Sequence, residues 1–331
     1  MIVQNAIVSD SAMTKDLPPL DLAKLLEICV DQLNDAIVIT EAEPFNLPGP
    51  RILWANKVFY DRTGYTPEEI IGQTPRILQG PLTDRATLDK IRKALEAWQP
   101  IRAEIQNYRK DGSTYWNEFQ IVPIANKQGW YTHWVSIQRD VTARKAIEAE
   151  VHQLAFYDTL TRLPNRRLLE DRLQQVMAAS KRNQTYAAIM FLDLDNFKSL
   201  NDSHGHAMGD LLLIEAANRL KACVREVDTV ARFAGDEFVV LLSELGNNQA
   251  AAHTQAGLIA EKIGTSLAEP YQLSACAETK PITHHCTASI GVATFINHTY
   301  SASDLMKWAD AAMYRAKAAG RNQICFHQTI I

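Results

Sequence analysis

The sequence predicts an α+β protein of two domains. Its 331 residues are too many for one ordinary core and suit two domains of roughly 130–180 residues each. In the first half, three alternating segments at 101–108, 114–123 and 131–140, separated by turns that contain glycine, are typical of an antiparallel meander. In the second half, a buried-strand pattern at 187–192 and a hairpin pattern at 230–242 are combined with helical segments.

Composition narrows the function classes. Hydrophobic residues make up 47% and charged residues 22%, as in globular proteins, and the net charge of −4 argues against a nucleic-acid or membrane partner. No apolar run approaches the roughly 18 residues needed to span a bilayer, and the N-terminus has no signal-peptide pattern. The five cysteines are scattered without C-x-x-C spacing, which favours free thiols in a reducing compartment: Cys29, Cys223, Cys276, Cys286 and Cys325. These features predict a soluble cytoplasmic protein.

The first elements follow from apolar spacing. We expect residues 1–19 to form a poorly ordered arm and Asp21 to cap a helix. The helix has an apolar stripe, formed by Leu22, Leu25, Leu26, Cys29, Val30 and Leu33. Strands are predicted at 36–40 and 52–54, with an insert loop at 43–50 between them, and a helix at 85–95.

The early helices and the terminal meander resemble a PAS domain. Within that superfamily, the segments Thr74–Thr87, Asn107–Gly112, Tyr115–Phe119 and Ser136–Gln138 are similar to flavin-binding LOV domains. The resemblance implies a flavin, FMN or FAD. Five residues match family positions that contact the flavin: Asn107, Asn117 and Gln138 at the polar ring edge, and Arg76 and Gln79 at the ribityl phosphate. Amides suit the ring edge because they both donate and accept hydrogen bonds.

One position departs from the LOV pattern. Pro75 stands where LOV domains hold the cysteine that forms an adduct with the flavin. Proline has no thiol, so no adduct can form there, and Cys29 on the N-terminal helix is a poor substitute. Two interpretations remain open. The domain either keeps a flavin that acts through its redox state, or has a PAS fold with a vestigial or differently filled pocket.

A helix is predicted to join the two halves. Asp140-Val141-Thr142 resembles the closing triplet of a PAS domain. A short heptad seam follows, formed by Arg144, Ile147, Val151 and Leu154 at spacings of 3, 4 and 3. This spacing is compatible with a parallel coiled coil between two copies; a helix packed on the next domain is the alternative. The predicted divisions are the arm 1–19, a sensor domain 20–140, a linker helix 141–156 and a second domain 157–331.

The turn of the second domain's hairpin carries two adjacent acids, Asp236 and Glu237. Neighbouring carboxylates repel each other unless a cation or substrate lies between them, although a polar hairpin tip is the default interpretation for two acids alone. Asp193 ends the buried strand at 187–192 and would meet the turn if that strand neighbours the hairpin. The segments Tyr157–Arg166, Asp193–Asp210 and Arg232–Phe238 resemble the GGDEF family of diguanylate cyclases.

The resemblance implies a palm-type, ferredoxin-like βαββαβ core and a set of site residues. Mg²⁺ (or Mn²⁺) would bind Asp193, the Leu194 carbonyl, Asp236 and Glu237, with Asp236 as the general base and Glu237 mainly a metal ligand. Lys198 would contact phosphates, Asn201, His206 and Asp210 the guanine, and Lys317 and Arg321 the triphosphate from one face of a helix ending at Gly320. Asp210 could also be a helix N-cap. Arg225 and Asp228 match the family's product-inhibition site.

The implied activity is condensation of two GTP into cyclic di-GMP with release of two pyrophosphates, in a homodimer formed through the PAS domain and the linker helix. The alternatives are a degenerate domain that binds GTP or cyclic di-GMP without turnover, and a sensory PAS scaffold whose partner does the work. Ala234 stands where the family usually has glycine, and Arg162 where glycine is common. If the turn needs a positive φ at Ala234, alanine costs on the order of 1 kcal/mol.

Overall fold

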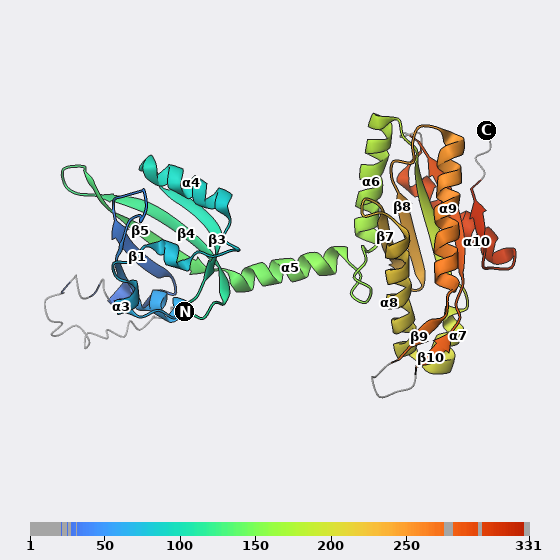
Figure 1. Ribbon diagram of the computed structural model, residues 1–331, viewed down its shortest axis with the longest axis horizontal. Coiled ribbons are helices and arrows are strands. Elements are labelled where there is room, and N and C mark those ends of the chain that lie inside the picture. Colours follow the sequence, from blue (N-terminus) through green and yellow to red (C-terminus); the bar gives the residue numbers. More distant parts are fainter. Residues whose placement is uncertain are drawn as a thin grey trace, which may run out of the picture. The chain divides into compact units, whose positions relative to one another are not determined.

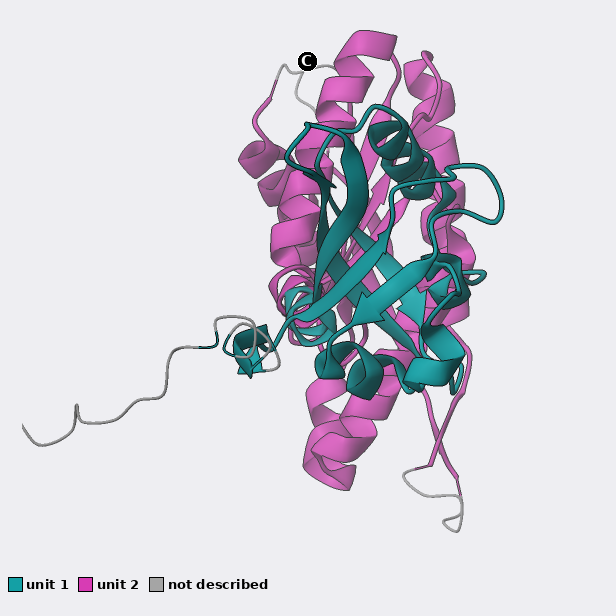
Figure 2. Ribbon diagram, turned by 90° about the vertical axis from the view of Figure 1, so that its left-hand side faces the viewer, with its two compact units in different colours: residues 1–148 teal, residues 149–331 magenta. Residues whose placement is uncertain are grey.

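The computed structural model describes residues 32–274, 281–296 and 300–327, together with Asp21, Leu25 and residues 28–30. The chain divides into two compact units, residues 1–148 and 149–331 (Figure 2), and the division falls within helix α5 (Thr142–Phe156). The predicted arm and the positions Leu22, Leu26 and Cys276 lie outside the described residues. Within those ranges, no helix is long and apolar enough to cross a membrane.

The first unit is built on a five-stranded antiparallel sheet with the order β2-β1-β5-β4-β3 (Figure 1). Its strands are β1 (Ala36–Glu41), β2 (Ile52–Ala55), β3 (Ile101–Tyr108), β4 (Thr114–Ala125) and β5 (Tyr131–Asp140). Buried and half-buried positions alternate along β1, as expected for a strand with one face on the core. The predicted antiparallel sheet is confirmed.

Short helices connect β2 to β3: α2 (Lys57–Thr63), α3 (Pro67–Ile70), the 3-10 helix η1 (Pro75–Leu78) and α4 (Arg85–Glu96). Local chemistry sets their ends. Asn56 accepts a hydrogen bond from the Phe59 N–H at the start of α2, and Asp84 caps α4 by accepting one from the Thr87 N–H. Gly64 ends α2 in the left-handed conformation, with φ at +76°.

The second unit contains a five-stranded sheet with the order β12-β11-β6-β8-β7. Its strands are β6 (Ala187–Leu194), β7 (Thr229–Ala234), β8 (Glu237–Leu242), β11 (Ala288–Phe295) and β12 (Ile324–Phe326). The first four strands form the predicted ferredoxin-like core, and β12 extends it by pairing in parallel with β11. A two-stranded sheet of β9 (Tyr271–Leu273) and β10 (Ile282–His284) lies apart from it.

Helices cover both faces of this sheet, which explains why every residue of β6 is buried. The helices are α6 (Arg166–Asn183), α7 (Phe197–His204), α8 (His206–Cys223), α9 (Gln249–Ala268) and α10 (Ala302–Ala318). Alternate β6 residues point to opposite faces: Met190 and Leu192 pack in the cluster with α8 and α9, whereas Ile189 and Phe191 pack with α6 and α10.

Helix α10 lies directly on β11 because Gly291 has no side chain. A Cβ atom at Gly291 would overlap the Ala309 carbonyl oxygen and the Met313 amide nitrogen of α10. Any larger residue would therefore push the helix away from the sheet. This close approach fixes the position of the helix that carries Lys317.

Candidate functional sites

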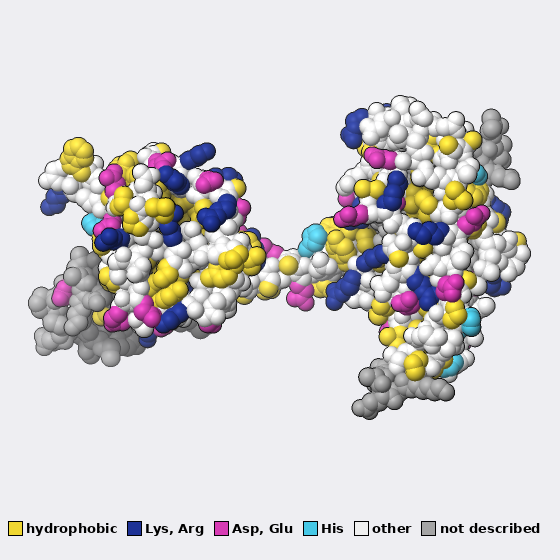
Figure 3. Space-filling view, viewed as in Figure 1, with side chains coloured by type: hydrophobic (Ala, Val, Ile, Leu, Met, Phe, Trp, Pro, Cys, Tyr) yellow, Lys and Arg dark blue, Asp and Glu magenta, His cyan; other side chains and the backbone are white. Residues whose placement is uncertain are grey.

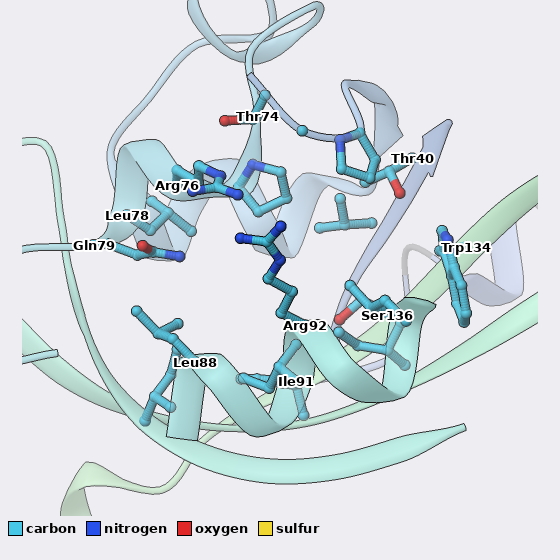
Figure 4. A pocket seen from close by; sticks show the side chains of 18 of the residues that line it. Thr40, Thr74, Arg76, Leu78, Gln79, Leu88, Ile91, Arg92, Trp134 and Ser136 are labelled. Atoms are coloured by element: carbon cyan, nitrogen blue, oxygen red, sulfur yellow. The ribbon is translucent and has the colours of Figure 1, made fainter. Parts of the chain in front are cut away.

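The first unit contains a cavity of about 330 Å³ bordered by the sheet, η1 and α4 (Figure 4). Most of its wall is apolar, formed by Val38, Leu78, Leu88, Ile91, Leu95, Ile105, Phe119, Ile121 and Trp134. The five residues predicted to contact a flavin also line it: Arg76, Gln79, Asn107, Asn117 and Gln138. An apolar pocket with a few convergent polar groups is the usual form of a small-molecule site.

Three of the residues that line the cavity are the amides Asn107, Asn117 and Gln138, and two of their oxygens have no hydrogen-bond partner among the described residues. Asn117 Nδ2 donates to Gln138 Oε1 at 3.1 Å, and Gln138 Nε2 donates to Ser136 Oγ at 3.2 Å. The buried Oδ1 atoms of Asn107 and Asn117 accept no hydrogen bond from the described residues. Each such buried acceptor costs about 1–3 kcal/mol.

Positive charge also lines the cavity. Figure 4 shows Arg76 from η1 and Arg92 from α4 extending into the same part of it, and Arg85 also lines it. Arg92 is held by Asn46 Oδ1 at 3.0 Å and by an ion pair with Glu96 at 2.8 Å. Guanidinium groups favour an anionic substituent on a ligand beside them. Arg85 and Arg92 were not predicted as site residues.

Pro75 lines the cavity where the LOV pattern places its cysteine. No cysteine is among the residues described as lining the cavity, and Cys29 is exposed. A ligand ring bound here therefore has no thiol beside it.

In the second unit, three acids meet at the end of the central strand. The pairing of β6 with β8 places Asp193 directly opposite Glu237. The Leu194 N–H donates to the Asp236 carbonyl at 3.3 Å, which holds the hairpin turn against the end of β6. Directly opposed residues have Cβ atoms about 4.5–5.5 Å apart. The predicted convergence of Asp193 with the hairpin acids is therefore present.

The acids disfavour one another's ionisation. Burial raises the pKa of Asp193, the ion pair between its Oδ2 and Lys317 Nζ at 2.6 Å opposes this, and the charge of Asp236 adds to the rise. Burial also raises the pKa of Glu237, with further contributions from the charges of Asp193 and Asp310. The single positive charge of Lys317 does not neutralise the three carboxylates of Asp193, Asp236 and Glu237. Among the described residues, no group of three or more His, Cys, Asp or Glu side chains is already arranged to hold a metal ion.

The hairpin turn has no strained alanine. Ala234 is the last residue of β7 and pairs with Glu237, so the turn consists of Gly235 and Asp236. The positive φ, +49°, belongs to Gly235, and Ala234 lies outside the left-handed region. The condition under which alanine would cost about 1 kcal/mol is not met.

The side chain of Arg232 supports this turn. Its Nε donates to the Gly235 carbonyl at 2.8 Å, and its Nη1 lies 3.1 Å from both carboxylate oxygens of Asp158. Hydrogen bonds from Thr161 together with this ion pair hold the pKa of the Asp158 carboxyl below its usual value despite burial. Arg232 thus joins the turn to the segment that follows α5.

The predicted phosphate-binding cations lie on two helices and one turn. Lys198 is exposed on α7, and Lys317 lies on α10, where it pairs with Asp193. Arg321 does not lie on the helix face, contrary to the prediction. Helix α10 ends at Ala318, before Gly320, and Arg321 follows in a left-handed turn with φ at +63°.

The predicted guanine-binding residues lie on α7 and α8. Asn201 of α7 has a buried Oδ1 without a hydrogen-bond partner in the described chain, and it lies so close to Gly209 of α8 that a Cβ there would overlap it. Asp210 is exposed and His206 begins α8. The interpretation of Asp210 as an N-cap is wrong, because Gly205 occupies the cap position and Asp210 lies inside the helix.

Arg225 and Asp228 form a compact pair before β7, at the opposite end of that strand from the turn. Arg225 Nε lies 3.2 Å from Asp228 Oδ2, and its Nη2 donates to the Ser243 carbonyl at 2.7 Å. Asp228 is buried and also accepts from the Ser243 N–H at 3.1 Å. The side chain of Arg225 remains 48% exposed, so its guanidinium can meet a ligand.

Two family models match parts of the chain. Residues 155–323, just over half of the chain, match the family described as diguanylate cyclase, GGDEF domain. The chain belongs to the GGDEF family of diguanylate cyclases. Residues 34–143 match the PAS domain family, so the predicted pair of domains is confirmed.

Three known proteins illustrate the likeness. MucR, a bifunctional diguanylate cyclase/cyclic di-GMP phosphodiesterase of Pseudomonas aeruginosa, is 45% identical over 54% of this chain. A crystal structure of the GGDEF domain of TpbB from the same species is 36% identical over 51% of this chain and 99% of that one, with a TM-score of 0.47. An RNA-binding light-oxygen-voltage receptor is 31% identical over 42% of this chain and 41% of that one, with a TM-score of 0.37. The chain spans about a quarter of the length of MucR, 24%.

Asp195 of this GGDEF domain was missed by sequence reasoning, although it lies two residues after Asp193. It is buried, at 3% exposed, and its carboxylate accepts hydrogen bonds from Thr287, Ser289 and the backbone N–H of Asn322. The only signal in the sequence was a second acid at the end of a buried strand. Its partners lie more than 90 residues away, so spacing could not identify them.

Proposed function

We propose that the chain is an active diguanylate cyclase, which condenses two GTP molecules into cyclic di-GMP and two pyrophosphates. The observation that carries this proposal is the meeting of Asp193 and Glu237 across the β6–β8 pair, with Asp236 in the adjoining turn and Lys317 beside them. Mutually repelling carboxylates, one buried and two partly buried, beside cationic residues suit a site for metal and phosphate.

The donor set fits Mg²⁺ or Mn²⁺. Carboxylates of Asp193, Asp236 and Glu237 and the carbonyl of Leu194 are hard oxygen ligands, and the raised pKa values of Asp193 and Glu237 indicate that positive charge is in deficit. A bound ion would offset negative charge on the phosphates and lower the pKa of the attacking hydroxyl.

The nucleotide would be held at both of its ends. Lys198, Lys317 and Arg321 would neutralise the triphosphate. Asn201 and Asp210, with His206 nearby, would bind the guanine. A carboxylate that accepts from the N1–H and the exocyclic amine excludes adenine, which offers no such pair of donors.

The chemical step is a transfer between two bound nucleotides. The 3′-oxygen of one GTP forms a bond to the α-phosphorus of the other, and the bond from that phosphorus to pyrophosphate breaks. The reciprocal transfer then closes the ring and releases the second pyrophosphate. Asp236 accepts the hydroxyl proton as general base. Each domain holds one GTP, so two domains must face each other and the active protein is a homodimer.

Helix α5 supports the dimer proposal. Ile147, Val151 and Leu154 are 60, 59 and 58% exposed and recur at the spacing of a coiled-coil seam. Figure 3 shows hydrophobic side chains along this helix. A second copy of α5 would cover them. We propose that the PAS domain regulates the cyclase through this helix and contributes to the dimer.

Product inhibition would act at Arg225 and Asp228. The exposed guanidinium beside a buried carboxylate offers donors for the phosphate and guanine of cyclic di-GMP. Strand β7 has six residues, so this pair lies roughly 20 Å from the hairpin turn. Product bound there would not compete directly with GTP.

The cavity of the PAS domain would hold a flavin, FMN or FAD. The amides of Asn107, Asn117 and Gln138 line the cavity and suit the polar edge of an isoalloxazine ring, and Arg76 and Arg92 suit a phosphate. Because Pro75 provides no thiol, the bound flavin would signal through its redox state. Copurified yellow colour, or fluorescence quenching on titration with FMN, tests the assignment.

The principal alternative is a degenerate domain that binds GTP or cyclic di-GMP as a signalling scaffold. The presence of all the acids and cations favours turnover. The experiment is to incubate the purified chain with GTP and Mg²⁺ and to analyse the products by chromatography, with Asp236→Asn as the control. Cyclic di-GMP from the wild type alone supports the cyclase, whereas GTP binding without product in either protein supports the scaffold.

A further inference from the structure

Asp195 connects the central strand to the turn that carries Arg321. It follows β6 and is 3% exposed. Its Oδ1 accepts from Ser289 Oγ at 2.8 Å. Its Oδ2 accepts from Thr287 Oγ1 at 2.6 Å and from the backbone N–H of Asn322 at 3.0 Å. A carboxylate that accepts three hydrogen bonds is firmly oriented.

The turn that Asp195 holds has an unfavourable backbone. Gly320, Arg321 and Asn322 have φ values of +118°, +63° and +46° in succession. Left-handed conformations cost residues with a Cβ roughly 1–2 kcal/mol each, although asparagine tolerates them better. The turn is tied to α10 by the hydrogen bond from the Arg321 N–H to the Ala316 carbonyl at 3.1 Å. The hydrogen bond from Asn322 to Asp195 ties its other side to the sheet.

The backbone of this strained turn sets the position of the Arg321 side chain. Among the described residues, Arg321 forms no ion pair, and its side chain is exposed. Nothing within the described chain therefore directs its guanidinium except the backbone of the turn. Strained backbone that is held in place by its surroundings commonly occurs at functional sites.

We propose that Asp195 is a positioning residue for Arg321. Its carboxylate holds the Gly320–Asn322 turn in the left-handed conformation, so that the guanidinium is presented to the phosphates of the nucleotide. This inference rests on the proposed function, because it takes the phosphates of GTP as the ligand of Arg321. Asp195 itself need not touch substrate.

Asp195 is also linked to the active site through its backbone, and experiment can separate this link from the effect of its side chain. Asp195 follows Leu194, the proposed carbonyl ligand of the metal. Hydrogen bonds hold the backbone of Asp195 independently of its side chain. The Asp195 N–H donates to the Thr287 carbonyl at 2.8 Å, and the Asp195 carbonyl accepts from Cys286 Sγ at 3.4 Å. A substitution that changes only the carboxylate therefore acts mainly on the turn.

The test compares ligands with and without phosphates. Binding of 3′-deoxy-GTP, which has no nucleophile and is not cyclised, is measured by calorimetry with Mg²⁺ alongside binding of guanosine. Asp195→Asn keeps the shape but removes the charge that strengthens the bond to Asn322. We expect about tenfold weaker binding of 3′-deoxy-GTP, with guanosine binding changed by less than about twofold. Equal weakening for both ligands would mean a general structural defect and would overturn the proposal.

A double-mutant cycle tests whether the effect passes through Arg321. In an Arg321→Ala background, Asp195→Asn should change 3′-deoxy-GTP affinity by less than about twofold; an undiminished tenfold effect contradicts the inference. Ser289→Ala is the matched control, because it removes a donor to the other oxygen and leaves the turn alone, so its affinity should match wild type. If Asp195→Asn does not fold, Thr287→Val should weaken nucleotide binding about threefold, and wild-type affinity in that variant refutes the proposal.

The outcomes separate this inference from the proposed function. If the wild type binds no nucleotide, the cyclase assignment fails and this inference fails with it. If the wild type binds 3′-deoxy-GTP and Asp195→Asn binds it equally well, only the role of Asp195 fails.

Discussion

Replacing Glu237 with glutamine should stabilise the metal-free protein while abolishing its activity. Glu237 lies opposite Asp193, and burial together with the charges of Asp193, Asp310 and Asp236 raises its pKa. Two unit charges about 5 Å apart repel by about 0.8 kcal/mol in water and about 3 kcal/mol at an effective dielectric constant of 20. Because Glu237 is only partly buried and Lys317 offsets part of the charge, we expect the free energy of unfolding of the variant to rise by an amount near the lower limit, about 1 kcal/mol.

The assay is urea unfolding of Glu237→Gln and wild type in EDTA. If the same change is followed by thermal unfolding, 1 kcal/mol corresponds to about 2–4 °C in Tm for a domain of this size. The matched control is Glu261→Gln on the exposed surface of α9, which should change stability by less than about 0.5 kcal/mol. Mg²⁺ should stabilise the wild type more than Glu237→Gln, since the variant lacks one proposed ligand.

The pH dependence has a definite sign. The folded-state pKa of Glu237 lies above its unfolded value, so the wild type loses stability as pH rises through the folded pKa. The advantage of Glu237→Gln should therefore be larger at about pH 8 than at about pH 5. A variant that is less stable than wild type in EDTA, or an advantage that grows as pH falls, would refute the electrostatic interpretation of the site.

Three further predictions concern the other parts of the chain. Arg225→Ala should remove inhibition by cyclic di-GMP, measured as initial rates with added product; unchanged inhibition would exclude the assigned site. Ala234→Gly should lower stability by about 0.5–1 kcal/mol in urea and change the rate less than about twofold, because Ala234 needs no positive φ; a large gain in rate would show that its methyl group obstructs substrate. Val151→Glu should shift the protein to monomer in sedimentation experiments and lower activity in parallel, and an unaltered dimer would place the interface elsewhere.

Much of the fold was predictable because turns and strand alternation are local signals. The strands at 101–108 and 131–140 match β3 and β5 residue for residue; a turn with glycine at 110–112 follows the first, and one at 127–129 precedes the second. The buried strand β6 was recognised from its apolar run, and its final acid indicated where a cation site would lie.

What escaped prediction depends on contacts between distant segments. The support of the hairpin turn by Arg232 requires Asp158, 74 residues earlier in the chain. Helix α10 ends two residues before Gly320, so the spacing of Lys317 and Arg321, although suited to one helix face, did not describe their positions. In the sensor cavity, Arg92 lies on a helix whose sequence pattern is that of a solvated amphipathic face, so nothing local distinguished it as a pocket residue.

The most direct test of the central claim is product formation by the purified chain. With GTP and Mg²⁺, the wild type should yield cyclic di-GMP and pyrophosphate in a ratio of about one to two, and Asp236→Asn should yield neither while still binding GTP. Wild-type protein that binds GTP but releases no cyclic di-GMP, or an Asp236→Asn variant that retains wild-type turnover, would contradict the account of the hairpin acids as catalytic groups.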